Sequence, residues 1–259
     1  MTITDTDLGF VESVAREAGA LLMHYQRDGF DVAHKGSIDL VTTADRESER
    51  LIVSAISARF PSHAIISEED VAVSGYVVGS GAIWYIDPLD GTTDFVHRYP
   101  NFAVSLALYA DAEPILAVVY DPTRAELFAA RRGGGAHLNG RPITVSRTSR
   151  LIESLLSSGF PYDVLESGRN IEAYQRLTLL SRGVRISGAA ALDLAWVACS
   201  RLDGYWEPEI KPWDGAAGAL IVREAGGRVS DLSDAEWQPA LPGVAASNRL
   251  LHALLLKET

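Results

Sequence analysis

The chain has 259 residues, of which 47% are hydrophobic and 22% are charged, a composition typical of a globular protein of one large domain or two small ones. Its net charge of −11 disfavours binding to nucleic-acid backbones and anionic lipids, so neither partner is expected. The single cysteine excludes an internal disulfide, and we expect neither a signal peptide nor a membrane span, which together predict a cytoplasmic protein.

Two helices are predicted near the start of the chain, over residues 8–25 and 44–59, because apolar residues recur there at spacings of three and four. A group of strands is predicted next, at 64–67, 83–87, 103–109, 115–120 and 126–130. Turns such as Asp121-Pro122 and Asn139-Gly140 leave little chain between strands, which favours antiparallel pairing.

After about residue 150, strand-like and helix-like segments alternate, which is typical of an α/β arrangement. Strands are expected at 155–158, 184–187, 204–207, 228–231 and 244–246, and helices at 166–181, 190–201, 214–225 and 248–257. We therefore predict an α+β half over residues 1–147 and an α/β half over residues 148–259, layered on each other and completing one site.

The most informative segment is 84–95, which reads W-Y-I-D-P-L-D-G-T-T-D-F. An apolar, β-favouring run ends at Asp87, and Pro88, which lacks an N–H group, is expected to stop regular pairing there. Asp90 then returns toward Asp87 across a tight bend, and the Leu89 carbonyl can face the same point. Two carboxylates and a carbonyl oxygen suit a hard divalent cation, and the lack of nearby cysteines argues against a soft one.

Gly91, Thr92 and Thr93 follow at once and supply backbone N–H groups and two hydroxyls. If a helical turn begins here, its positive end can hold a phosphate group. A D-x-x-D pair alone is most often a solvated surface turn, but the β run before it and the G-T-T after it make this pair unusual. The segment therefore favours a site for magnesium and phosphate.

Two further acidic segments fit such a site. Glu68, Glu69 and Asp70 follow an apolar strand, where either a cation lies among them or water screens them, and the sequence leaves both possibilities open. Asp214 stands at the start of a predicted helix, where a plain N-cap role is the alternative to metal binding. Because an acidic chain repels anionic substrates, a phosphate site here needs a metal cation.

Taken together, these segments resemble the inositol monophosphatase family of magnesium-dependent, lithium-sensitive sugar phosphatases. The similarity runs over most of the chain, and the D-P-L-D-G-T-T and W-D-x-A-A-G segments in this order are highly specific. The segments that carry the resemblance are Lys35–Thr42, Glu68-Glu69, Asp87–Phe95, Gly188–Asp193, Trp213-Asp214 and Glu224–Gly227.

The resemblance implies an α+β protein with a five-layer αβαβα sandwich of the inositol monophosphatase and fructose-1,6-bisphosphatase type, usually a homodimer. It also implies that two or three magnesium ions bind, with manganese as a substitute. The implied metal ligands are Glu68, Asp87, the Leu89 carbonyl, Asp90 and Asp214, with Asp87 bridging two ions.

The resemblance further implies how the substrate binds. Gly91 and Thr92 would hold the phosphate, and Asp45 matches the family acid that pairs with Thr92 to orient a water molecule. The alcohol part of the substrate would face Gly188, Ala189, Ala190, Asp193 and Glu207.

Direct in-line attack by water, without a phosphoenzyme, is the mechanistic hypothesis. The metal site that includes Glu68 would lower the pKa of the attacking water, while Thr92 and Asp45 orient that water and accept its proton. The site that includes Asp90 and Asp214 would stabilise the leaving alkoxide.

Two positions depart from the family's usual pattern. Asp94 stands where asparagine is usual and adds negative charge nearby. Gly215 replaces a commonly larger residue after Asp214, and we expect it to loosen the start of that helix. Neither departure removes a predicted ligand.

Two alternatives come from other classes of protein. A phosphatase with an aspartyl nucleophile uses acids two residues apart, in D-x-D-x-T, whereas these acids are three apart. Some relatives of the family act in RNA synthesis through partner contacts, so an additional role of that kind is the second alternative.

The substrate is open at this stage among inositol monophosphate or a similar polyol phosphate, histidinol phosphate, fructose bisphosphate, nucleotide 3′-phosphates and NADP. Glu207 would accept hydrogen bonds from hydroxyls or from an amine, and it would repel a second phosphate. This favours magnesium-dependent hydrolysis of a polyol monophosphate.

Overall fold

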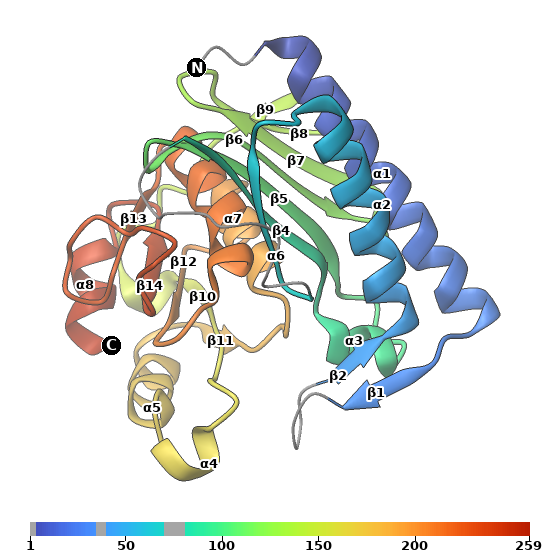
Figure 1. The fold of residues 1–259 in the computed structure, drawn as a ribbon. Coiled ribbons are helices and arrows are strands. Elements are labelled where there is room, and N and C mark those ends of the chain that lie inside the picture. Colours follow the sequence, from blue (N-terminus) through green and yellow to red (C-terminus); the bar gives the residue numbers. More distant parts are fainter. Residues whose placement is uncertain (1–3, 35–39, 70–80) are drawn as a thin grey trace.

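The structure, a computed structural model, describes residues 4–34, 40–69 and 81–259. Two helices, a seven-stranded sheet, two central helices, a five-stranded sheet and further outer helices are stacked in that order (Figure 1). This is the five-layer αβαβα sandwich that the resemblance implied, so the predicted fold class is confirmed. Lys35–Asp39 of the quoted motif and Asp70 of the acidic segment lie outside the described residues.

Helices α1 (Asp5–Asp28) and α2 (Thr43–Arg59) form the first layer. Each begins with a capping box, in which the side chain of Thr4 or Thr42 accepts a backbone N–H and an aspartate three residues on returns the bond. Both helices were predicted. The first one starts earlier than residue 8 because its polar cap, and not its apolar stripe, sets the start.

The larger sheet is a meander in the order β3-β4-β5-β6-β7-β8-β9. The β3–β4 pair is parallel and every later pair is antiparallel, as the short turns predicted. Its strands are β3 (Ala64–Ser67), β4 (Ala82–Asp90), β5 (Ala103–Ala110), β6 (Glu113–Asp121), β7 (Glu126–Arg131), β8 (Ala136–Leu138) and β9 (Arg141–Ile143).

A small antiparallel ribbon of β1 (Val32–His34) and β2 (Leu40–Thr42) lies ahead of α2. The sequence did not predict it, because strands of three residues carry too little periodicity to be recognised.

Regular pairing of β4 is interrupted at Pro88, as predicted, but the strand does not end there. The strand continues to Asp90, with Asp87 opposite Ser105 and Asp90 opposite Ala103 of β5. One extra residue on β4 therefore makes a bulge around Pro88, which has no N–H for the ladder. Residues three apart in a regular strand face opposite sides, but the bulge allows Asp87 and Asp90 to face the same side.

The smaller sheet has the order β11-β10-β12-β14-β13, in which β10 is parallel to both neighbours and the other pairs are antiparallel. Its strands are β10 (Leu155–Ser158), β11 (Gly183–Arg185), β12 (Gly204–Glu207), β13 (Arg228–Ser230) and β14 (Val244–Ser247). The central helices α6 (Ala190–Ala198) and α7 (Pro212–Glu224) separate it from the larger sheet.

The helix predicted over residues 166–181 is in fact two helices, α4 (Val164–Ser167) and α5 (Ile171–Leu180). Gly168 and Asn170 adopt left-handed backbone conformations between them, and these break the helix.

The last helix, α8 (His252–Glu258), begins later than the predicted residue 248. The Asn248 carboxamide oxygen accepts the Leu251 N–H at 3.1 Å, which holds this stretch in a turn. A short 3₁₀ helix, η1 (Leu151–Glu153), precedes β10.

Strand alternation divides the apolar side chains between two cores. In β5, Val104, Leu106 and Leu108 pack toward α1 and α2, whereas Ala107 and Tyr109 pack toward α6 and α7. The second core contains residues from both sheets, so it joins the two predicted halves of the chain. The division at residues 147 and 148 remains a prediction. Among the described helices, none is long and apolar enough to cross a membrane.

The contact between α6 and α7 generates a stability prediction. A Cβ atom at Gly218 of α7 would lie 2.4 Å from the Leu194 Cβ of α6, whereas a Cβ at Gly9 of α1 would meet nothing within 4 Å. Gly218→Ala should therefore lower the free energy of unfolding by about 1–3 kcal/mol. Gly9→Ala, the matched control, should raise it by about 0.5–1 kcal/mol. Urea unfolding of both variants checks this, and equal effects would contradict the packing described.

Candidate active site

Strand pairing brings the first two acidic segments together. Ser67 of β3 lies opposite Ile86 of β4, and the Glu68 N–H donates to the Ile86 carbonyl at 3.2 Å. Glu68 therefore follows the end of β3 and lies beside Asp87 of β4. Residues that are distant in sequence thus meet at one edge of the larger sheet.

Helix α7 brings Asp214 to the same place. Ser105, which lies opposite Asp87, donates its hydroxyl to the Trp213 carbonyl at 3.1 Å. Pro212 occupies the first turn of α7, and the Asp214 carboxylate accepts the Lys211 N–H at 3.4 Å. Asp214 therefore has a capping role, which does not conflict with the proposed role in metal binding.

Gly215 does not leave the start of α7 loose, contrary to the expectation from sequence. A Cβ atom at this position would lie 2.8 Å from the Trp237 indole, and Trp237 is fully buried. The indole occupies the space that a larger residue would need, so the glycine permits close packing.

The carboxyl groups interact strongly. Asp87 is 2% exposed and Asp90 is 7% exposed. Burial raises the pKa of Asp87 well above its ordinary value, and the charges of Glu68, Asp90 and Asp214 raise it further. Burial also raises the pKa of Asp90, with Asp214 as the strongest neighbouring charge. These acids are therefore close enough to repel one another in a region that water screens poorly.

The described acidic, histidine and cysteine side chains do not already form a compact set of three or more metal ligands. Charge repulsion acts over longer distances than a metal–oxygen bond. The acids can therefore raise the pKa of Asp87 and Asp90 without being close enough to share an ion in this arrangement. The available donors are carboxylate and carbonyl oxygens, which fit a hard cation such as magnesium.

A hydrogen-bonded chain connects α2 to the short helix α3 (Thr92–Val96). The Thr92 hydroxyl lies 3.0 Å from the Asp45 carboxylate and 3.1 Å from the Leu89 carbonyl. The other oxygen of Asp45 accepts the N–H and the hydroxyl of Thr42, the N-cap of α2. Burial raises the pKa of Asp45, and these hydrogen bonds oppose the rise.

Gly91 needs both its backbone freedom and its missing side chain. Its φ angle is +92°, and a Cβ atom would lie 2.9 Å from the Asn101 carbonyl oxygen and 3.3 Å from the Ala189 Cβ. The Phe95 N–H donates to the Gly91 carbonyl, so the amides that precede it in α3 have no acceptor within the helix. Gly91 thereby places backbone donors beside the turn that leads into α6.

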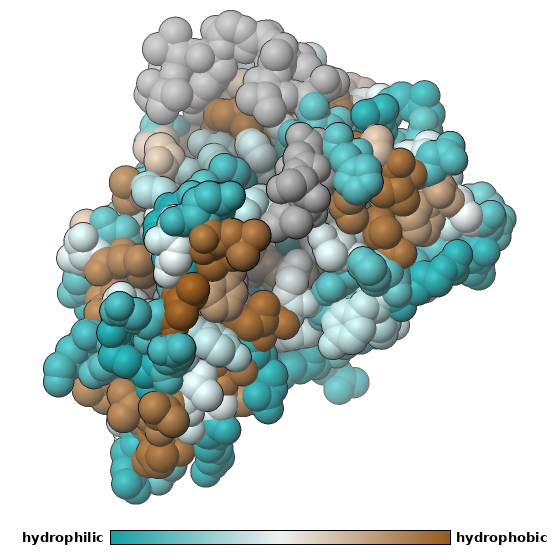
Figure 2. All heavy atoms as spheres, turned by 90° about the horizontal axis from the view of Figure 1, so that it is seen from below, coloured by the Kyte–Doolittle hydropathy of each residue, from teal (hydrophilic) through white to brown (hydrophobic). Residues whose placement is uncertain are grey.

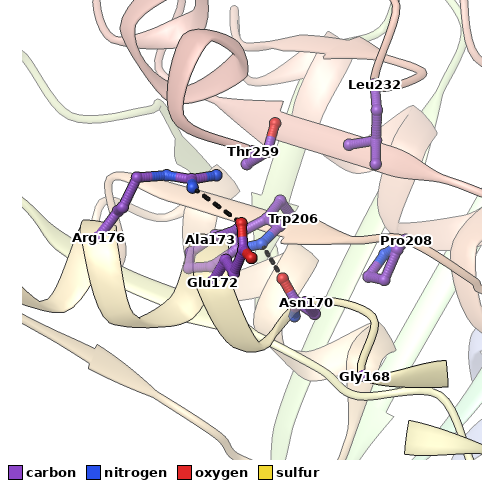
Figure 3. Close-up of a pocket in the computed structure, with 9 residues that line it drawn as sticks. All are labelled: Gly168, Asn170, Glu172, Ala173, Arg176, Trp206, Pro208, Leu232 and Thr259. Carbon is purple, nitrogen blue, oxygen red and sulfur yellow. Dashed lines mark hydrogen bonds and ion pairs between the residues drawn. The ribbon is translucent and has the colours of Figure 1, made fainter. Parts of the chain in front are cut away.

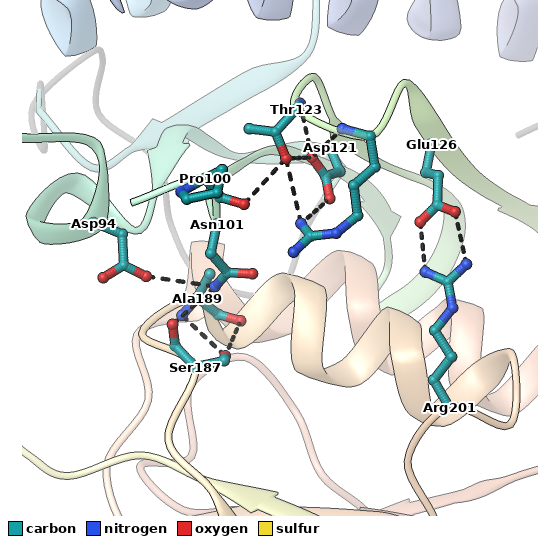
Figure 4. Close-up of polar contacts among 10 residues, drawn as sticks. Asp94, Pro100, Asn101, Asp121, Thr123, Glu126, Ser187, Ala189 and Arg201 are labelled. Carbon is teal, nitrogen blue, oxygen red and sulfur yellow. Dashed lines mark hydrogen bonds and ion pairs between the residues drawn. The ribbon is translucent and has the colours of Figure 1, made fainter. Parts of the chain in front are cut away.

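That turn, Ser187–Ala189, is held from both halves of the chain. Asn101 donates its amide to the Ser187 carbonyl at 2.8 Å (Figure 4). The Ser187 and Ser157 hydroxyls lie 2.7 and 2.8 Å from the same carboxylate oxygen of Asp193. Burial is the main cause that raises the pKa of Asp193 to about 7. The Ala191 N–H, at the start of α6, donates to Asp90 at 2.8 Å and links this turn to the acidic cluster.

Glu207 ends β12 and faces the same region. The Tyr205 hydroxyl donates to its carboxylate, and a Cβ atom at Gly159 would lie 2.5 Å from that carboxylate. Burial is the main cause that raises the pKa of Glu207 to about 8, and the charges of Asp214 and Asp193 add to the effect.

A separate cavity of about 240 Å³ lies on the other side of β12 (Figure 3). Trp206 lines it and donates to the Asn170 side chain at 2.6 Å. Adjacent residues of a strand point to opposite faces, so Trp206 and Glu207 point away from each other. This cavity is therefore not part of the acidic site.

The comparisons with known proteins agree with the geometry. Residues 4–259 match the model of the inositol monophosphatase family. The chain is 48% identical over 215 residues to an inositol-1-monophosphatase of Synechocystis, covering 83% of this chain and 74% of the relative. It is 43% identical over 249 residues to the Nus factor SuhB of Pseudomonas aeruginosa, covering 93% and 91%. The solved inositol monophosphatase of Anabaena superposes with a TM-score of 0.88 at 41% identity, covering 98% of this chain and 95% of that one.

This chain belongs to the inositol monophosphatase family. It is a phosphatase of that family, whose members are generally metal-dependent.

The structure brings most of the predicted site residues to one region and adds others that the sequence analysis missed. The position of Tyr205 beside Glu207 was predictable, because residues two apart in a strand lie on the same face of the sheet. Asn101, Ser157 and Ser187 gave no signal, because isolated polar residues in loops and strand ends are common. Only the folded chain shows that they hold the Ser187–Ala189 turn.

The raised pKa of Glu207 generates a prediction for the metal-free protein. The folded pKa is about 8, above the ordinary value of 4.5, so this group contributes stability below about pH 4.5 that is lost as pH rises through 8. With EDTA present, the free energy of unfolding should fall between pH 5 and 8. Glu207→Gln should reduce that fall by roughly 2–4 kcal/mol. Urea unfolding at several pH values checks this, and an unchanged pH slope in the variant would contradict it.

Proposed function

We propose that this protein hydrolyses a small phosphate monoester of the polyol class, such as inositol monophosphate, with magnesium. The observation that carries the proposal is that Asp87 and Asp90 of β4 lie within charge range of Glu68, which follows β3, and of Asp214 in α7. The backbone donors at Gly91 follow Asp90 directly. An acidic cluster with two buried members, next to donors for phosphate, suits a cation that neutralises both.

Two or three magnesium ions would be held by the Glu68, Asp87, Asp90 and Asp214 carboxylates and the Leu89 carbonyl, with manganese as a substitute. When bound, such ions supply Lewis-acid stabilisation and a water molecule of lowered pKa. The charge repulsion on Asp87 and Asp90 supports this assignment, because a bound cation would turn that repulsion into attraction.

The remaining steps belong to the chain's own groups. Thr92 lies between Asp45 and the Leu89 carbonyl, a position suited to orient an attacking water and pass its proton to Asp45. The Gly91 and Thr92 amides would hold phosphate oxygens, since the first amides of a helix lack partners within it. Asp45 is fully buried, which raises the pKa of its carboxyl group, and a raised pKa suits a proton acceptor.

The alcohol side of the substrate would face Gly188, Ala189, Ala190, Asp193 and Glu207. Asp193 and Glu207 are both acids, which accept hydrogen bonds from hydroxyl groups and, when ionised, repel a second phosphate. Similarity to an inositol-1-monophosphatase of Synechocystis supports the polyol class.

An additional partner role in RNA synthesis is a second candidate function. One specific finding favours it, namely the 43% identity to a protein named as a Nus factor. The net charge of −11 supports contact with other proteins rather than directly with nucleic acid.

We propose that the protein forms a homodimer through the surface around α4, α5 and β11. Apolar side chains are unusually exposed there, with Tyr162 at 63%, Leu165 at 90% and Leu179 at 81%. Figure 2 views the molecule from below, where α4 and α5 lie in Figure 1, and shows apolar patches among hydrophilic side chains. The open edge of the smaller sheet, β11, adjoins this surface.

Asp90→Asn tests the proposed metal chemistry. The amide keeps the shape of the carboxylate but removes a charge that the cations need, so turnover should fall roughly a thousandfold or more. Release of phosphate from inositol 1-phosphate at varied magnesium concentration measures this. Magnesium should also raise the melting temperature of the wild type much more than that of the variant.

Asp111→Asn is the matched control, because Asp111 is exposed in the β5–β6 turn and its φ angle of +52° suits asparagine. It should retain wild-type turnover and magnesium response. Near-normal activity in the Asp90 variant would refute the proposed metal site.

A further inference from the structure

Asp94 touches the turn that the proposed substrate alcohol would face. It lies in α3, one helical turn beyond Gly91, and its carboxylate sits against the backbone of Gly188. A Cβ atom at Gly188 would be only 2.8 Å from that carboxylate, and the φ angle of Gly188 is +84°. The positive φ angle favours glycine at position 188, and the missing side chain leaves room for the Asp94 carboxylate beside the turn.

Asn101 connects Asp94 to this turn. Asn101 donates its amide to the Ser187 carbonyl at 2.8 Å and points the same amide at the Asp94 carboxylate, at 3.4 Å (Figure 4). Asp94 is half-buried, so its charge is only partly screened by water. The carboxylate is thus held near the junction of the phosphate side and the alcohol side of the site.

Asp193 provides an independent sign that a polar ligand belongs here. It is 2% exposed, and one of its carboxylate oxygens receives both the Ser157 and the Ser187 hydroxyls. Its other oxygen is buried and has no hydrogen-bond partner within the described part of the chain. Buried carboxylate oxygens without partners are costly, and a donor on a bound ligand would satisfy this one.

Most of the described charges around this turn are acidic, with His97, whose charge lowers the pKa of Asp94, as the exception. The pKa of Asp193 is raised by burial and also by the charge of Asp94, so the two carboxylates are neighbours. The pKa of Glu207 is raised by burial and also by the charges of Asp214 and Asp193. The neighbouring charges that act most strongly on Asp193 and Glu207 are therefore all acidic.

We propose that Asp94 is a specificity-determining residue which, with Asp193 and Glu207, makes the alcohol side of the site prefer a substrate that carries an ammonium group and resist one that carries a second phosphate. The inference rests on the proposed phosphatase site and deepens it. An ammonium group supplies up to three hydrogen-bond donors, one of which could satisfy the unpartnered Asp193 oxygen. It also carries a positive charge, which the neighbouring acidic side chains attract.

Two pairs of substrates isolate this charge effect. Glucosamine 6-phosphate and glucose 6-phosphate differ by an amine in place of a hydroxyl. Fructose 1,6-bisphosphate and fructose 1-phosphate differ by the second phosphate. For each pair, the ratio of kcat/KM values is measured with saturating magnesium in the wild type, Asp94→Asn and the control Asp111→Asn, with the fold checked by circular dichroism.

The wild type should favour the amine over the hydroxyl and the monophosphate over the bisphosphate. Asp94→Asn should shrink each ratio by about tenfold, the scale of one partly screened unit charge, mainly through KM. Asp111→Asn should leave both ratios unchanged, which excludes an effect of net charge. Asp94→Ser, a shorter uncharged residue, should behave as Asp94→Asn does if charge and not shape is responsible.

Three outcomes have distinct meanings. Unchanged ratios in an active Asp94→Asn variant would overturn the inference. An equal loss of activity on all four substrates would also overturn it, because it would show a structural role only. Absence of magnesium-dependent hydrolysis of every ester by the wild type would instead overturn the proposed function itself.

Discussion

The repulsion between carboxylates in a poorly solvated pocket is the constraint on which the site depends. Burial is the main cause that raises the pKa of Asp87 and of Asp90, and the charges of Glu68 and Asp214 raise both further. A protein normally avoids such an arrangement, because unpaired buried charges are expensive. The fold retains it, which is physically reasonable where a cation compensates the charges in the working state.

The layered fold brings these carboxylates together. Parallel pairing of β3 with β4 brings Glu68 beside Asp87, and the bulge at Pro88 allows Asp90 to face the same side. The packing of α7 against the larger sheet then adds Asp214, through the bond between Ser105 and the Trp213 carbonyl. A small residue also lets α7 pack closely against α6, since Gly218 contacts Leu194 where a methyl group would not fit.

Most of the strands were predicted because long apolar runs and turn residues are local signals, whereas the five-layer fold class followed from the resemblance to the inositol monophosphatase family. The D-P-L-D-G-T-T motif also identified the acids at one strand end. It could not show that β4 continues past Pro88, because bulges depend on the partner strand. Nor could it show the break at Gly168 and Asn170, or that Asp94 contacts Gly188, since these depend on how distant segments pack.

Diffraction from crystals soaked in manganese tests the central claim most directly, because the anomalous signal locates each ion without reference to activity. We expect at least one strong anomalous peak shared by the carboxylates of Asp87, Asp90 and Asp214, with oxygen ligands at about 2.1–2.3 Å. Ordered side chains with no peak among these three acids, at manganese concentrations that support turnover, would contradict the account.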